Sequence, residues 1–100
     1  MTTNFPKIFR VRQSFDDVRV ADVAGEVHAQ LSRLELKDKI RPGATVAVTA
    51  GSRGIANIAE IIRAIVARLK HLGASPFIVP AMGSHGGGTA EGQRAVVESY

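Results

Sequence analysis

Two short apolar runs, separated by one long amphipathic helix, constrain the fold of this chain most strongly. Residues 45–49 (TVAVT) and 77–79 (FIV) are almost entirely apolar or β-branched, which is typical of strands buried on both faces of a parallel sheet. Between them, apolar residues recur at helical spacing over Ile58–His71, with Asn57 placed as the N-cap and Gly73 as the C-cap. We therefore expect the two runs to be adjacent parallel strands joined by a right-handed crossover.

The flanking segments extend this alternation. Residues 7–13 (KIFRVRQ) alternate apolar and basic side chains, which favours a short strand with one solvated face. Apolar positions over Val20–Leu34 follow helical spacing and predict an amphipathic helix that starts near Ala21. Thr89 is placed to cap a final helix over Ala90–Tyr100. The predicted fold class is α/β, with strands and helices alternating around a mostly parallel sheet, as in part of a Rossmann-like domain.

The length of 100 residues fits one domain or part of one. Within it we distinguish two parts. Residues 1–44 are expected to form a leading strand and helix, and residues 45–100 are expected to form the strand–helix–strand–helix unit that carries the motifs. The helical pattern of residues 93–100 is followed by no glycine, asparagine or proline. We therefore expect this to be the N-terminal α/β domain of a longer protein, whose C-terminal domain is its partner.

Composition argues against several classes of site and partner. The chain has no cysteine, so it has no disulfide and no thiolate ligand, which fits a reducing cytoplasm. The net charge of +4 comes from scattered basic residues, and aromatic residues amount to four Phe and one Tyr, so we expect no nucleic-acid partner. No apolar run approaches the roughly 18 residues of a membrane span. No pair of candidate ligands has the spacing of a metal site.

A glycine-rich loop follows each predicted central strand. Gly51–Gly54 (GSRG) follows the first strand, and Pro80–Thr89 (PAMGSHGGGT) includes the loop after the second. Because α/β folds bind ligands at the shared carboxyl edge of parallel strands, we expect Arg53 and His85 to face one pocket. Each loop also leads into a helix N-terminus, which favours an anion such as a carboxylate or phosphate. The alternative interpretations are a solvated loop arginine and a histidine that caps a turn.

The first loop has one short resemblance. Val48–Ala56 (VTAGSRGIA) is similar to the T-G-x-x-x-G-x-G turn with which short-chain dehydrogenases bind NAD(P). Ala50 and Ala56 stand where the first and third glycines of that turn would be, and 44 residues precede the strand that opens that family's fold. An NAD(P)-binding module is therefore a minor alternative.

A longer resemblance covers roughly Thr45–Gln93 and includes both loops. This stretch has a loop arginine, a helix ending in L-x-x-L-G-A, a second strand, and then A-x-G-[ST]-H and T-x-E-[GQ]. It resembles the N-terminal domain of the lactate racemase-like family. The resemblance implies an isomerase that racemises or epimerises a small 2-hydroxy acid. It also implies a nickel-pincer nucleotide in the full-length protein, bound covalently by no residue of this segment.

Carried over position by position, the resemblance implies a role for each loop residue. His85 would be the catalytic acid/base, and Arg53 would bind the substrate carboxylate beside Ser52 and Ser84. The cofactor side would be formed by the remaining small residues of the second loop: Gly83, Gly86, Gly87, Gly88 and Thr89. Ala50 and Gly54 stand where the family has an aspartate and a proline, which leaves the substrate open. The alternative function is a non-catalytic carboxylate- or phosphate-binding domain, or a scaffold.

Overall fold

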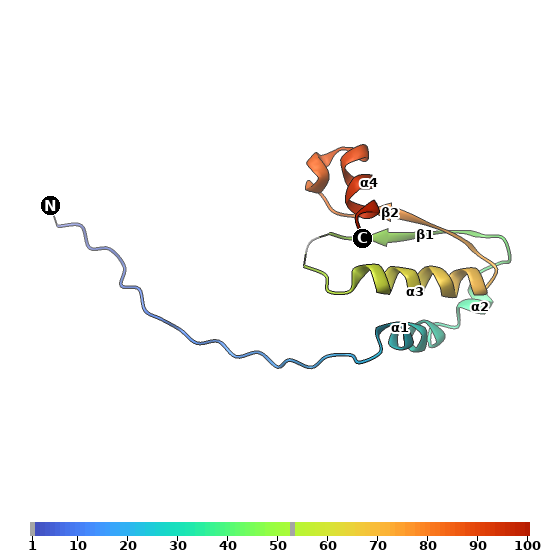
Figure 1. Ribbon diagram of the computed structural model, residues 1–100, viewed down its shortest axis with the longest axis horizontal. Helices are drawn as coiled ribbons and strands as arrows, with labels where there is room; N and C mark the ends of the chain where they lie inside the picture. The colour runs from blue at the N-terminus through green and yellow to red at the C-terminus, as the bar shows by residue number, and fades with distance from the viewer. Residues whose placement is uncertain (1, 53) are drawn as a thin grey trace.

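The computed structural model describes residues 2–52 and 54–100, and Figure 1 shows a long N-terminal arm joined to a small α/β unit. The elements in chain order are α1 (Val23–Ser32), α2 (Leu36–Lys39), β1 (Thr45–Ala50), α3 (Ile58–His71), β2 (Ser75–Pro80), the 3-10 helix η1 (His85–Gly88) and α4 (Ala90–Glu98). Strands and helices alternate from β1 onward, so the predicted α/β class is confirmed. The described residues contain two strands, where the sequence predicts three.

β1 and β2 form a parallel two-stranded sheet. Their residues pair in register, from Thr45 opposite Ser75 to Ala50 opposite Pro80. The predicted adjacency of the two strands is therefore confirmed, and each strand extends beyond the run from which it was predicted. Because parallel strands end at the same edge, the loops after Ala50 and Pro80 begin side by side.

The helix α3 has the bounds that the sequence predicts. It packs on one face of the sheet, where Val48, Leu69 and Ala74 form the buried core. Gly73 follows the helix with a φ of +85°, the left-handed conformation expected at this end. Asn57 occupies the N-cap position, but its own backbone is left-handed and its side chain makes no capping hydrogen bond.

The second face of the sheet is open, which corrects the prediction that both strands are buried on two faces. Phe77 is 51% exposed, and its neighbours Ala47 and Thr49 on β1 are exposed as well. The physical reason is that α3 packs on the side that carries Val48, and α1 packs on α3 in turn. The core of the described unit is therefore one-sided.

The ends of two helices differ from the prediction by a few residues. α1 begins at Val23, not near Ala21, because the carboxylate of Asp22 accepts a hydrogen bond of 2.9 Å from the Gly25 N–H. α4 begins after Thr89 as predicted, and it ends at Glu98, two residues before the predicted end. Capping side chains thus fix the starts of α1 and α4.

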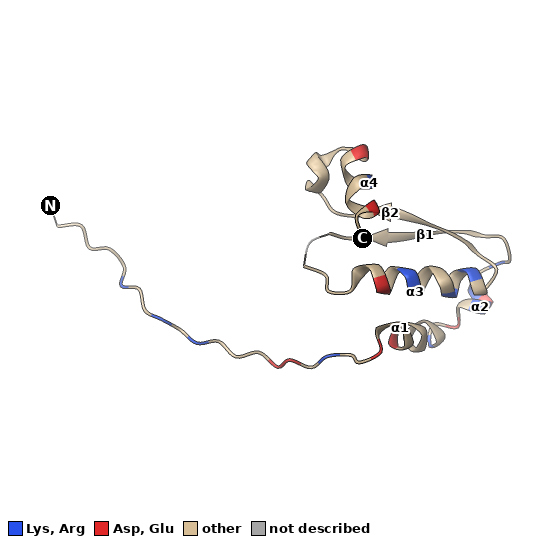
Figure 2. Ribbon diagram, in the orientation of Figure 1, with Lys and Arg blue, Asp and Glu red and all other residues tan. Residues whose placement is uncertain are grey.

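The arm, residues 2–20, is extended and forms no helix or strand. The strand predicted for Lys7–Gln13 is therefore not present, because no neighbouring strand supplies the hydrogen bonds that a strand needs. Its apolar side chains remain in solvent: Ile8 is 96% exposed and Phe9 is 83% exposed. Figure 2 shows that lysines and arginines are spread along the arm and along α3.

Candidate functional site

The loops at the carboxyl edge of the sheet meet through a serine and a histidine. Ser52, two residues after β1, is hydrogen bonded through Oγ to Nδ1 of His85, which opens η1 after β2. Both residues are half-buried, and they are 33 positions apart in the chain. The parallel pairing of β1 and β2 is what brings them together, because it starts both loops at one edge.

This bond fixes the imidazole and leaves its second nitrogen for other partners. Nδ1 is engaged by Ser52, and among the described residues no hydrogen bond is made by Nε2 of His85. If Nδ1 carries the proton and donates to Oγ, Nε2 holds a lone pair and can accept a proton. The arrangement can therefore support general acid/base chemistry at Nε2.

The other predicted substrate residues are not part of this contact. Arg53, expected to hold a carboxylate, lies outside the described residues. Ser84 precedes His85 and is exposed, and its side chain makes no capping bond to η1. Of the four residues assigned to catalysis and substrate, the structure brings together Ser52 and His85.

The glycines of the second loop divide into one packed position and three open ones. A Cβ on Gly86 would lie 2.5 Å from the carbonyl carbon of Gly92, so this glycine allows the loop to pack on α4. Gly83, Gly87 and Gly88 have φ values of +60°, +69° and +66°, and a Cβ on any of them would meet no atom within 4 Å. These three positions leave the backbone accessible to a ligand.

Thr89, predicted to face a cofactor, has its hydroxyl engaged in the cap of α4. Its Oγ1 accepts a hydrogen bond of 3.1 Å from the Gly92 N–H and donates one of 3.3 Å to the Gly86 carbonyl. The predicted helix cap is therefore confirmed. These two bonds also connect the loop to the first turn of α4.

The sequence interpretation missed two residues of the site. One lies in α4, and the other follows shortly after its end. The side-chain amide of Gln93 donates to the Gly83 carbonyl at 2.6 Å, and the Tyr100 hydroxyl donates to the Gly51 carbonyl at 2.5 Å. Gln93, Val97 and Tyr100 are four and three residues apart, a spacing that places them on one side of a helical segment. That spacing was the available signal, and the two hydrogen bonds show that this one segment contacts both loops.

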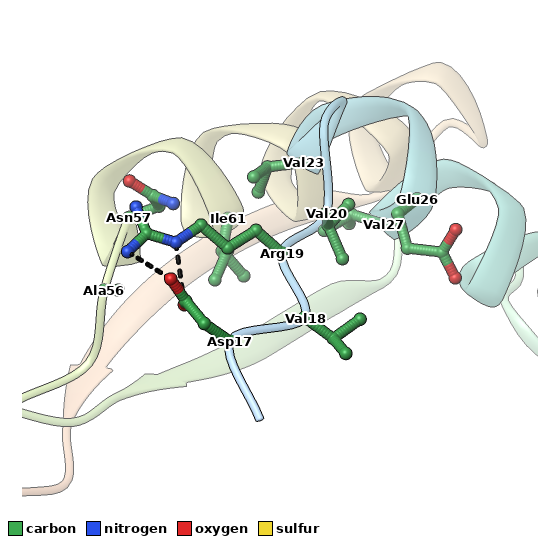
Figure 3. Close-up of a pocket in the computed structure, with 10 residues that line it drawn as sticks. All are labelled: Asp17, Val18, Arg19, Val20, Val23, Glu26, Val27, Ala56, Asn57 and Ile61. Carbon is green, nitrogen blue, oxygen red and sulfur yellow. Dashed lines mark hydrogen bonds and ion pairs between the residues drawn. The ribbon is translucent and has the colours of Figure 1, made fainter. Parts of the chain in front are cut away.

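A large hollow lies at the base of the arm and includes neither Ser52 nor His85. Its volume is about 760 Å³, and apolar side chains of the arm, α1 and α3 line it, among them Val20, Val27 and Ile61. Figure 3 shows Asp17 and Arg19 paired at its rim, with a separation of 2.9 Å. This hydrogen bond raises the pKa of Arg19. The pair is exposed and stabilises the fold little.

Comparison of the chain with known proteins finds no match. No protein-family model, curated protein or solved structure matches it. Within residues 2–52 and 54–100, no group of three or more histidine, aspartate or glutamate side chains is arranged to hold a metal ion. No helix in the same ranges has the length and apolar character needed to cross a membrane.

Proposed function

We propose that the carboxyl edge of the sheet is one wall of the substrate site of an isomerase that racemises or epimerises a small 2-hydroxy acid. The observation that carries this proposal is the hydrogen bond between Ser52 and His85, which joins the two loops and orients an imidazole at this edge. Inverting a 2-hydroxy acid through a hydride-accepting cofactor requires a group that removes and returns the hydroxyl proton. An imidazole does this near neutral pH.

Each residue of the wall has a distinct role in this proposal. His85 is the acid/base through Nε2. Ser52 is a positioning residue in this proposal: its Oγ accepts a hydrogen bond from the Nδ1–H in the tautomer whose Nε2 is basic. Arg53 binds the substrate carboxylate, because a guanidinium grips a carboxylate through two parallel hydrogen bonds. The exposed hydroxyl of Ser84 is a further donor for the substrate.

The nickel-pincer nucleotide implied by the resemblance would supply hydride acceptance and return when bound. The second loop fits a role as part of its binding surface, because Gly83, Gly87 and Gly88 leave open space where side chains would stand. The described residues offer no metal-ligand cluster. The proposal therefore includes a C-terminal domain that holds the rest of the cofactor, and a cytoplasmic location that suits a chain without cysteine.

The second candidate function is carboxylate or phosphate binding without turnover. It is favoured by the same open glycines and by α4, whose N-terminus begins directly after them. Free backbone N–H groups at such a position bind an anion and require no base. The two functions therefore differ in what they require of His85.

The test separates binding from turnover in the full-length protein. Conversion between the enantiomers of 2-hydroxy acids, with lactate as the first probe, is followed by chiral chromatography, and binding by calorimetry. We expect His85→Asn to lower the conversion rate at least ~100-fold while binding persists. Arg53→Ala should weaken binding roughly 10- to 100-fold, from a loss of about 1.5–3 kcal/mol, and Arg53→Lys should restore part of it.

The outcomes distinguish the two candidates. A parent protein that binds hydroxy acids or phosphate and converts none of them supports the binding function. Conversion by His85→Asn at the parent rate contradicts the isomerase proposal. Loss of folding in both His85→Asn and Arg53→Ala, measured by circular dichroism, would mean that these residues serve the fold.

A further inference from the structure

The two outer edges of the sheet differ in their hydrogen-bonding groups. Across the ladder, the Ser75 N–H donates to the Ala44 carbonyl and the Ala81 N–H donates to the Ala50 carbonyl, each at 2.8 Å. Because successive backbone groups of a strand point to opposite sides, the alternate residues point away from the partner strand. These outward residues are 76, 78 and 80 on β2 and 45, 47 and 49 on β1.

Prolines close the edge of β2 and leave the edge of β1 open. Pro76 and Pro80 have no N–H, so Ile78 is the single outward donor of β2. On β1 the outward residues Thr45, Ala47 and Thr49 all carry an N–H and a carbonyl. The sheet can therefore accept a further strand beside β1, whereas β2 is protected against strand addition.

The arm has the properties of a strand that could pair with this open edge of β1. It is already extended, and Phe5, Phe9, Val11 and Phe15 alternate with a second set of positions that includes Arg10. As a strand it would place these four apolar side chains on one face, together with Lys7 and Gln13, and Arg10 and Arg12 on the other face, together with Ile8. The four apolar side chains are each at least 78% exposed in the undocked arm. Their removal from water is the driving force for docking.

The base of the arm sets the direction in which a docked strand must run. Asp17–Val20 lie with Asn57 and Ile61 around one hollow, at the start of α3 (Figure 3). The start of α3 follows the carboxyl end of β1. A strand parallel to β1 brings residue 15 directly to this end. An antiparallel strand would leave residue 15 at the amino end of β1, about 16 Å from its carboxyl end at ~3.3 Å per residue. Only one residue separates residue 15 from Asp17, which is too little chain to span that distance.

The position of α1 fits a parallel third strand. In Figure 1, β2, β1, α3 and α1 succeed one another, and α1 packs on α3. Arm, α1 and β1 would then form a second strand–helix–strand crossover, for which the right-handed sense is the rule. No residue of α1 is buried in the present arrangement. A docked arm would cover its half-exposed apolar side, and the hollow at the arm base would close.

We propose that residues 5–15 dock in the same molecule as a third strand, parallel to β1, along its open outer edge. Phe9 and Val11 then face the helices with Val48, and Arg10 lies on the solvent face with Ala47. The extended arm is the undocked state of this strand.

Amide hydrogen exchange on the intact chain tests the docking, with Ile78 as the internal control. We expect the Ala47 and Thr49 amides to exchange at least ~100-fold more slowly than the outward Ile78 amide. Substituting both Phe9 and Val11 with serine should remove this protection. The matched control, serine at Arg10 and Arg12, should keep it. Exchange of Ala47 as fast as Ile78, or protection that survives the Phe9 and Val11 substitutions, would overturn the proposal.

Disulfide trapping tests the pairing and its molecularity, since the chain has no cysteine of its own. Arg10→Cys with Ala47→Cys should form a disulfide within one chain under mild oxidation. Arg10→Cys with Phe77→Cys is the matched control and should not, because β2 lies one strand further away and its Cα is beyond disulfide reach. Cross-linked dimers from the first pair would mean that arms exchange between molecules, and would overturn docking in the same molecule, as would no cross-link at all.

Discussion

The two loops at the carboxyl edge are held in different ways. The second loop, residues 81–89, is secured by the helix that follows it, through the close packing of Gly86 on Gly92 and the Thr89 cap. Among the described residues of the first loop, residues 51–57, the Gly51 carbonyl is held by Tyr100 and the Ser52 hydroxyl by His85. The first loop is thus held by side chains that are distant in sequence.

This difference indicates which half of the site is rigid. The loop that carries His85 is tied to α4 by backbone packing and by hydrogen bonds within ten residues. The loop that carries Ser52 depends on contacts 33 and 49 residues away. We infer that the loop of His85 keeps its conformation when a ligand binds, and that the loop of Ser52 changes its conformation.

The largest loss of stability is expected from Gly86→Ala, which breaks the packing of the second loop on α4. The new Cβ would lie 2.5 Å from the Gly92 carbonyl carbon, in a residue with a φ of +63°. The left-handed backbone costs about 1–2 kcal/mol and the overlap about 1–3 kcal/mol more. We expect the free energy of unfolding, measured with urea, to fall by roughly 2–5 kcal/mol.

Gly87→Ala is the matched control, because it changes the neighbouring glycine in open space. Its φ is +69° and its Cβ would meet no atom within 4 Å. The loss should therefore be limited to the backbone term of about 1–2 kcal/mol. Equal losses for the two variants would show that Gly86 is not packed against α4 as described.

A smaller effect is expected from Thr89→Ala, which removes the cap between the second loop and α4. Losing an N-cap hydroxyl costs about 1 kcal/mol. Thermal unfolding should show this loss, and the amides of the first turn of α4 should exchange faster. Thr89→Ser keeps the hydroxyl and should behave like the parent. Destabilisation by serine as large as that by alanine would contradict the capping role.

Residues 45–100 were largely predictable from sequence because local signals and tertiary packing agree there. The bounds of α3, the pairing of β1 with β2 and the Thr89 cap all follow from apolar periodicity and turn chemistry. The arm was not predictable in the same way. Its alternating pattern predicts a strand, but a strand forms only when it pairs with a neighbouring edge, and the arm as described is unpaired.

The location of the site at the carboxyl edge of the sheet was predictable from sequence, but the contacts between its residues were not. Strand order alone puts Ser52 and His85 at one end of the sheet. That Gly86 is occupied by packing depends on the approach of α4, which local sequence does not specify. The contacts of Gln93 and Tyr100 were missed for the same reason: their spacing places them on one side of a helical segment, but nothing in the sequence marks the backbone carbonyls that they bind.

The smallest effect is expected from Tyr100→Phe, which acts on the first loop alone. The hydroxyl that holds the Gly51 carbonyl is lost, at a net cost of about 0.5–1.5 kcal/mol. Because this loop is secured by few contacts, the change should appear as faster amide exchange in residues 51–57, with residues 83–89 unaffected. Gln93→Leu is the converse control, since it releases the Gly83 carbonyl and should affect the second loop. If Tyr100→Phe loosens both loops equally, they are held as one unit, and the distinction between a fixed and an adjustable half is wrong.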